Sequence, residues 1–305
     1  MYFPKFWQRG EHEGFVCWGF SDESSGEARE RAQGRARIIA ERFHSGEALR
    51  SYGYPDRPMR EPVLQVMASS TQTEPAGVIT RNSYGCMVLN AARMFIADVD
   101  HRPTGKDERQ PGILQSLFAR NRKPTGTEAG KDLRASSVLQ KVGEVVSRDH
   151  GGLAFVYETA GGLRVVLAHR EMNPCSEETR PTLDFVGSDP LYLRLCCNQK
   201  SFRARITPKP WRCGHHAPTE RWPFLETKSA KSFEAWESEY LRKIQDYSVV
   251  RLVERVGDGK IHAEIAPLLA LHDEIARADR SDLRLAWDRC VQLFSFSSDQ
   301  LAVYR

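Results

Sequence analysis

The chain has 305 residues, of which 40% are apolar and 28% charged, and this composition is ordinary for a folded protein. Its length exceeds what one small core needs and favours one large domain or two lobes. No stretch approaches the roughly 20 consecutive apolar residues that cross a bilayer. The N-terminus also lacks the apolar core of a signal peptide. These features predict a cytoplasmic protein without a membrane partner.

The cysteines and the distribution of charge indicate whether disulfide bonds and phosphate-bearing partners are expected. The seven cysteines are scattered, odd in number and without a C-x-x-C pair, which favours buried thiols over a disulfide framework. The net charge of +4 identifies no partner by itself. Residues 191–222, however, carry seven Lys or Arg and only one acid, with aromatic residues between them. Such a surplus attracts phosphate groups, although a solvated basic face has the same composition.

Residues 1–62 are predicted to form an N-terminal strand–helix segment. Residues 15–20 have the apolar composition of a strand, and Ser21 and Asp22 then offer a helix N-cap. The helix is expected to end near Gly46, and prolines make residues 51–62 an irregular connector. Five residues at near-helical spacing mark its apolar face: Ala28, Ala32, Ala36, Ile39 and Phe43.

Residues 63–227 are predicted to form a central α+β domain. Three strands at 78–81, 86–89 and 94–99 are separated by turns, which predicts a β-meander. Residues 101–132 are polar and unusually long for a connection, with a short helical stretch at 113–118. This is typical of a functional flap or a disordered insertion. The expected elements beyond it are a helix around 138–146, a hairpin of 153–157 and 163–168, a short helix at 191–197 and a strand at 202–206.

Residues 228–305 are predicted to form a helical C-terminal lobe. Phe233, Trp236, Tyr240 and Ile244 recur at helical spacing, which is typical of a core-facing stripe. Further helices are expected at 265–275 and 282–294, and residues 249–256 are expected to be extended. The predicted fold class is therefore α+β, with a mixed or antiparallel sheet, helices on one face and this lobe.

Asp98 and Asp100 end an apolar run and are the first candidate site. Residues two apart on a strand point to the same face, so both carboxylates are expected on one side. Paired carboxylates can hold Mg²⁺ or Mn²⁺, with water and substrate phosphates completing the shell. These residues suit phosphoryl or nucleotidyl transfer. The alternative is a strand end whose acids pair with nearby arginines or cap a turn.

The glycine turn at 161–162 leads into a strand that carries two further candidates. Arg164 could hold a phosphate group. His169, at the strand end, could act as a metal ligand or carry a proton. The alternative for His169 is a structural or surface histidine.

A basic strand and the segment after it complete the candidate set. Arg203 and Arg205 alternate with Ala204 and Ile206, so both guanidinium groups are expected on one face. Their forked donors match phosphate, and Lys209 and Arg212 add charge nearby. The alternative is an exposed strand that arginines keep soluble.

Taken together, these segments resemble the archaeo-eukaryotic primase superfamily over residues 77–212. The shared parts are a strand that ends in Asp98-x-Asp100, a later glycine turn into a strand, and a basic strand beyond it. The resemblance implies an RRM-like core and nucleotide polymerisation with Mg²⁺ or Mn²⁺. The family's histidine position holds Arg164 here, with His169 five residues later, and Asp184 and Asp189 are both available as a third acid. The same segments also look like those of uncharacterised bacterial proteins, which supplies no activity.

The leading functional prediction is therefore a metal-dependent nucleotidyl or phosphoryl transferase related to primase-polymerases. Asp98 and Asp100 would bind the metal with His169 assisting, and nucleotides or nucleic acid would be the partner. The first alternative is a non-catalytic nucleic-acid-binding or partner-binding protein with a degenerate primase-like fold. The second is a small-molecule hydrolase that uses His169 and the carboxylates. The predicted phosphate-binding residues are Arg164, Arg203, Arg205, Lys209 and Arg212.

Overall fold

The computed structural model describes residues 1–47, 58–100 and 128–286, with the side chains of helix α3 from residue 135 onward. The chain opens with an antiparallel hairpin of β1 (Phe6–His12) and β2 (Phe15–Ser21). Glu13 and Gly14 connect the strands with positive φ angles, the backbone shape of a tight two-residue turn. Helix α1 (Ser25–His44) follows, and Ser24, not Ser21, accepts the capping hydrogen bond from the N–H of Glu27.

Helix α1 packs on the hairpin through small residues. Its buried positions repeat every four residues, so the packed face includes Ala40, whereas Phe43 is 56% exposed. Gly19 of β2 permits the close approach, since a Cβ there would stand 2.2 Å from the carbonyl oxygen of Ala28. The predicted helix is therefore confirmed with a slightly rotated apolar face. Its buried residues are Ala28, Ala32, Ala36 and Ala40.

The first sheet of the main body is antiparallel and has the order β3-β4-β5-β9. The strands predicted at 78–81, 86–89 and 202–206 are confirmed, and β3 is an addition to the prediction. Asn90 of β5 faces Arg203 of β9 in the register. The strands are β3 (Val63–Met67), β4 (Gly77–Arg81), β5 (Met87–Ala91) and β9 (Phe202–Arg205).

The second sheet has the order β11-β7-β8-β6 and is also antiparallel. The predicted meander is wrong in its last step, because β6 does not pair with β5 but crosses to β8. Its residues Phe95, Ile96 and Ala97 are all fully buried, which suits a strand with packing on both faces. The strands are β6 (Phe95–Asp100), β7 (Ala154–Thr159), β8 (Gly162–Leu167) and β11 (Val250–Val256).

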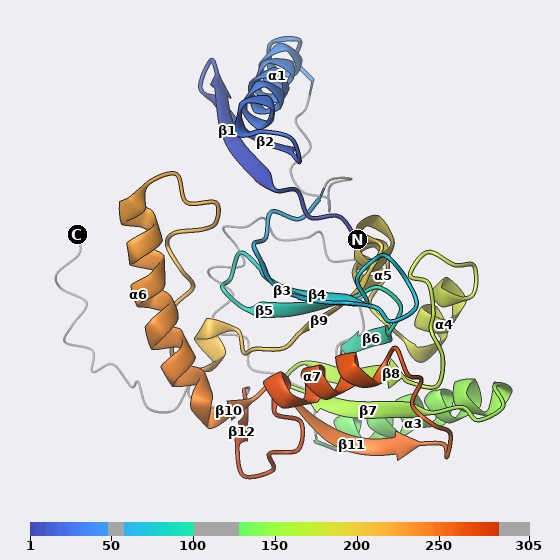
Figure 1. The fold of residues 1–305 in the computed structure, drawn as a ribbon. Coiled ribbons are helices and arrows are strands. Elements are labelled where there is room, and N and C mark those ends of the chain that lie inside the picture. Colours follow the sequence, from blue (N-terminus) through green and yellow to red (C-terminus); the bar gives the residue numbers. More distant parts are fainter. Residues whose placement is uncertain (48–57, 101–127, 287–305) are drawn as a thin grey trace.

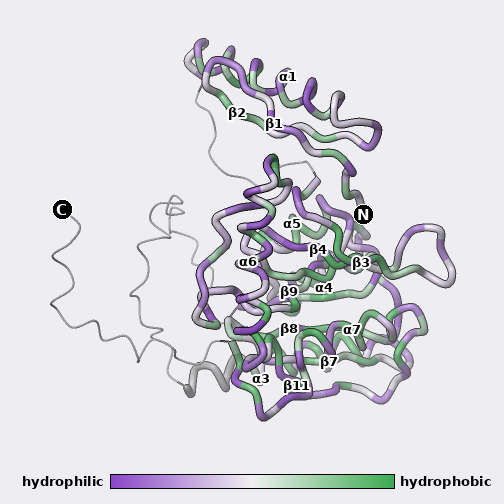
Figure 2. Tube along the Cα trace, turned by 60° about the vertical axis from the view of Figure 1, so that its left-hand side comes forward, coloured by the Kyte–Doolittle hydropathy of each residue, from purple (hydrophilic) through white to green (hydrophobic). Residues whose placement is uncertain are grey.

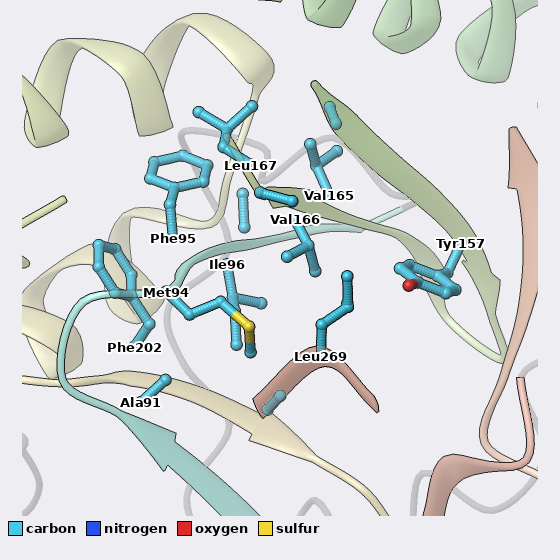
Figure 3. Packing of buried hydrophobic residues seen from close by; sticks show 14 of the residues in the cluster. Ala91, Met94, Phe95, Ile96, Tyr157, Val165, Val166, Leu167, Phe202 and Leu269 are labelled. Carbon is cyan, nitrogen blue, oxygen red and sulfur yellow. The ribbon is translucent and has the colours of Figure 1, made fainter. Parts of the chain in front are cut away.

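The two sheets meet where β9 of the first lies beside β6 of the second (Figure 1). The buried rings of Phe202 and Phe95 join them, with centroids 5.4 Å apart. Figure 3 shows these rings side by side, and it shows Ile96 near Leu269 of helix α7 (Ala266–Ala276). One continuous core therefore spans both sheets and fixes the position of β6 relative to β9.

The helices predicted around 138–146, at 191–197, around 233–244 and at 265–275 are confirmed, and Figure 2 shows hydrophobic residues along β8. The C-terminal part is not helical throughout, since β11 joins the second sheet and β10 (Tyr247–Ser248) pairs with β12 (Arg284–Leu285). Residues 282–286 hold no helix, and the rest of the helix predicted at 282–294 lies outside the described residues, as do residues 101–127 of the predicted flap. None of the described helices has the length and apolar character to cross a bilayer. The helices are α3 (Glu128–Arg148), α4 (Thr179–Val186), α5 (Pro190–Gln199) and α6 (Thr227–Lys243).

Candidate nucleic-acid interface

Strand β6 places Asp98 beside Arg164 of β8, and the two side chains form an ion pair. The register pairs these residues directly across the ladder. Arg164 donates from Nε to Oδ1 at 2.8 Å and from Nη2 to Oδ2 at 3.3 Å, so both carboxylate oxygens are engaged. The Arg164 side chain is only 3% exposed. Burial lowers the pKa of this guanidinium, but Asp98 more than offsets that effect, so Arg164 stays charged.

Arg164 also connects β9 and α7 to this pair. Its Nη1 donates to the carbonyl oxygen of Arg205 at 3.0 Å and lies 3.1 Å from Nε2 of His272. Because a guanidinium can only donate, Nε2 of His272 must accept, and the imidazole proton lies on Nδ1. That Nδ1 is 2.8 Å from Oδ1 of Asp273. Burial lowers the pKa of His272, which agrees with a neutral ring. Arg164 is therefore a structural centre and not an exposed phosphate ligand.

Asp100 lies two residues further along β6 and has a different environment. It is exposed and pairs in register with Gly162 of the glycine turn. Although the residue as a whole is exposed, its carboxylate is partly desolvated by the surrounding atoms, which raises the pKa of Asp100, and the carboxylates of Asp189 and Asp98 raise it further. Asp189 is held nearby because its N–H donates to the carbonyl oxygen of Asp98 at 3.4 Å. Three carboxylates therefore gather where β6 ends.

These carboxylates do not form a ready metal site. Within residues 1–47, 58–100 and 128–286, no three His, Cys, Asp or Glu side chains are placed to share one ion. Of the two acids that the sequence suggested as a third ligand, the structure brings Asp189 to Asp98 and leaves Asp184 exposed on α4. The predicted binding of Mg²⁺ or Mn²⁺ at Asp98 and Asp100 stays a prediction.

His169 is not brought to the acidic pair. Its Nε2 lies 2.8 Å from Oδ2 of Asp149, and its Nδ1 contacts the backbone of Leu153 at 3.1 Å. The register places Asp100 at the Gly162 end of β8, whereas His169 lies beyond the opposite end. Its 5% exposed side chain ties the end of α3 to β8. This position corrects the prediction that His169 acts as a catalytic residue beside Asp98. The hydrolase alternative also needs His169 next to the carboxylates, and the structure does not place it there.

Arg203 is likewise an internal residue. Its Nη2 lies 2.8 Å from Glu61 Oε1, and its Nη1 donates to Asn90 Oδ1. The exposed fractions are 7% for the Arg203 side chain and 2% for that of Glu61. Thr80 also donates to Glu61, at 2.5 Å. This buried network encloses the Arg203 guanidinium, which corrects the prediction that Arg203 binds phosphate.

Arg205, Lys209 and Arg212 lie close enough to influence one another's charge, and we name them the cationic cluster. Burial lowers the pKa of Lys209 to about 8, with the positive charges of Arg205 and Arg212 acting in the same direction. Burial and then Arg205 lower the pKa of Arg212. Asp100 opposes both shifts. The cluster is therefore a compact group of half-buried cations beside one carboxylate.

Helix α6 holds the segment that carries the cluster. The hydroxyl of Tyr240 donates to the carbonyl oxygen of Pro208 at 2.6 Å, and it contacts the Thr207 hydroxyl at 2.9 Å. The Thr207 hydroxyl accepts the N–H of Met87 at 2.8 Å, which ties the segment to β5. Residues 210–212 then form the short helix η2 (Pro210–Arg212). Lys209 and Arg212 are thus placed on fixed backbone.

Two exposed aromatic residues border the cluster. Trp211 and Tyr84 are 50% and 43% exposed, and their rings meet edge to face with centroids 5.2 Å apart. The ammonium group of Lys209 lies 5.5 Å from the Trp211 ring centroid. Tyr84 lies in the turn between β4 and β5, and its ring partner Trp211 comes much later in the chain. No sequence pattern around Tyr84 predicted this contact.

No family model matches this chain, and no match was found among the curated proteins or the solved structures.

Proposed function

We propose that this chain binds nucleic acid through the cationic cluster and the neighbouring Tyr84–Trp211 pair, without metal-dependent chemistry at Asp98. This corresponds to the non-catalytic alternative with a degenerate primase-like arrangement. The observation that carries the proposal is that three cations lie close to an exposed pair of aromatic rings, Tyr84 from the β4–β5 turn and Trp211 from η2. The proposal concerns the surface formed by β9, residues 206–212 and the β4–β5 turn.

The electrostatics of the cluster support an anionic ligand. Like charges held close together oppose one another, and this is part of why the pKa values of Lys209 and Arg212 are lowered. A phosphate group between them would replace repulsion by attraction. Two guanidinium groups can each donate two parallel hydrogen bonds to phosphate oxygens, and Lys209 adds a point charge.

The aromatic pair distinguishes a nucleic acid from a simple phosphate. Every base offers a π face, and stacking on an exposed aromatic ring contributes about 1–3 kcal/mol per base. Trp211 is attached to the same short helix as Arg212, so a base and its adjacent phosphate can be contacted together. Unpaired bases are the ones that can stack in this way, which favours single strands.

The Asp98–Arg164 pair supports the absence of metal chemistry at this position. A metal ion would need carboxylate oxygens that now accept hydrogen bonds from a buried guanidinium. Displacing Arg164 would leave its charge buried without a partner, at a cost of about 3–5 kcal/mol. We therefore infer that Arg164 supplies the positive charge that a metal would supply in a primase-like site.

A metal-dependent nucleotidyltransferase is the second candidate. The gathering of Asp100, Asp189 and Asp98 favours it, since a divalent cation would relieve the repulsion that raises the pKa of Asp100. In that case Mn²⁺ would bind through Asp100, and nucleotide incorporation would depend on that residue.

Fluorescence anisotropy with labelled oligonucleotides tests the proposal. We expect single-stranded DNA to bind more tightly than a duplex of equal length. Arg205→Ala and Lys209→Ala should each weaken binding about 5- to 10-fold, and Trp211→Ala by a similar factor. Lys231→Ala, which removes an exposed lysine from α6, is the matched control and should leave affinity unchanged.

Calorimetric titration with Mn²⁺ separates the two candidates. The binding proposal predicts no heat of binding in the micromolar range for the wild type. A 1:1 isotherm that Asp100→Asn abolishes, together with Mn²⁺-dependent nucleotide incorporation, would establish the second candidate instead. Equal affinity of the wild type and the three Ala variants for DNA would refute binding at this surface.

A further inference from the structure

Two cysteines lie in contact on the surface. Cys175 belongs to the connection between β8 and α4, and Cys197 lies near the end of α5. Their sulfur atoms are 3.1 Å apart, both residues are exposed, and both are free thiols. A disulfide bond has an S–S length of about 2.05 Å. The two sulfur atoms therefore need to close by only about 1 Å to form one.

The local structure holds both residues in this position. The side-chain oxygen of Asn173 accepts the N–H of Cys175 at 2.9 Å, and the backbone carbonyl oxygen of Asn173 accepts the hydroxyl of Thr179 at 2.6 Å. The Cys175 thiol itself donates to the carbonyl oxygen of Cys197 at 3.2 Å. Cys196, the neighbour of Cys197, is fully buried in the core, so α5 cannot rotate without exposing it. The contact between the two thiols is thus fixed by the fold.

We propose that Cys175 and Cys197 are a redox modification site that forms a reversible intramolecular disulfide with low-molecular-weight disulfides as oxidants. The thiolate of Cys197 attacks one sulfur of the oxidant, forms a mixed disulfide and releases one thiolate. The Cys175 sulfur then loses its proton, attacks the Cys197 sulfur and releases the second thiol. Two protein thiols are oxidised, and one reagent disulfide is reduced to two thiols.

The order of attack follows from the environment of the two sulfurs. The Cys175 thiol donates its hydrogen to the carbonyl oxygen of Cys197, and partial burial together with the contact with Cys197 raises the pKa of Cys175 to about 11, so this residue stays protonated at neutral pH. It is the weaker nucleophile in the first step. Once Cys197 is in a mixed disulfide, the adjacent Cys175 acts as the resolving thiol.

A Cys175–Cys197 disulfide would restrain the segment between these two residues, which includes Asp189 next to Asp98. It spans 22 residues and encloses α4 and Asp189, which caps α5 beside Asp98. Closing a loop of this length restricts the unfolded chain. We expect the melting temperature of the oxidised protein to rise by roughly 5 °C relative to the reduced protein.

Intact mass analysis of the full chain in defined ratios of oxidised to reduced glutathione tests this site. We expect a loss of two hydrogen atoms, and peptide mapping after alkylation of the remaining thiols should show Cys175 linked to Cys197. Dithiothreitol should reverse the change. In Cys175→Ser, Cys197 should retain a stable glutathione adduct, because its resolving partner is missing.

Cys17→Ser is the matched control and should still form the bridge, because Cys17 is buried in the N-terminal hairpin. The proposal is overturned if both thiols remain open to alkylation under the most oxidising ratio. It is also overturned if oxidation gives only intermolecular dimers, or if Cys175→Ser loses the same two hydrogen atoms. Circular dichroism of both serine variants confirms that each is folded.

Discussion

Two arginines of similar sequence context have different environments in this protein, because Arg203 is buried and Arg205 is partly exposed. Arg203 and Arg205 alternate on one strand, as the sequence predicts, yet Glu61 and Asn90 enclose only the first. Glu61 lies between Pro58 and Pro62 in the predicted connector, so no local pattern indicated that it would pair with Arg203. Arg205 is partly exposed, and its predicted contact with phosphate stays a proposal, whereas the internal position of Arg203 depends on a residue 142 positions away.

Changing Glu61 to Gln should destabilise the protein by about 3 kcal/mol, because it leaves the buried Arg203 charge without its partner. Urea denaturation measures this loss. Glu23→Gln, at an exposed position before α1, is the control and should change stability by less than about 0.5 kcal/mol. An equally small effect of Glu61→Gln would mean that Arg203 is not enclosed.

The lowered pKa of Lys209, about 8, gives the proposed binding a defined pH dependence. Lys209 is charged below this value and loses its proton above it. DNA affinity should therefore fall as the pH rises from about 7 to 9, beyond any change shown by Lys209→Arg. Anisotropy titrations across this range measure the effect. Parallel profiles for the two proteins would argue against a Lys209 contact with phosphate.

At the scale of elements, local periodicity predicted the strands and helices well but not their partners. The hairpin of β7 and β8 and the helices α1, α5, α6 and α7 follow from spacing and turn residues that lie within a few positions. The pairing of β6 with β8 joins residues 66 positions apart at Asp98 and Arg164, and it depends on the core between the sheets. The same limitation explains why His169 was wrongly placed near the acidic pair.

Gly162 is the residue on which the β6–β8 pairing depends most directly. A Cβ at this position would lie 1.9 Å from the carbonyl oxygen of Val99, so Gly162→Ala must push β8 away from β6. We expect a loss of about 2–3 kcal/mol of stability in urea denaturation. Gly34→Ala in α1 is the matched control, since a Cβ there meets nothing within 4 Å. It should stabilise the helix by about 0.5–1 kcal/mol.

At the scale of the whole molecule, the α+β class and the antiparallel sheets agree with the sequence prediction. The arrangement of two four-stranded sheets joined at β6 and β9 did not follow from it. This junction brings the Asp98–Arg164 pair against the carbonyl oxygen of Arg205, and it places the cationic cluster beside Asp100. The proposed function depends on this junction, because it holds Asp98 in an internal ion pair with Arg164 and places the cationic cluster, which we propose binds phosphate, next to Asp100.

The salt dependence of single-stranded DNA affinity tests this account most directly. If three cations each neutralise about one phosphate, a plot of log K against log salt concentration should have a slope of roughly −2 for the wild type. The Arg205→Ala, Lys209→Ala, Arg212→Ala triple variant should have a slope near zero and bind at least tenfold more weakly. A flat plot for the wild type, or an unchanged slope for the triple variant, would contradict the account.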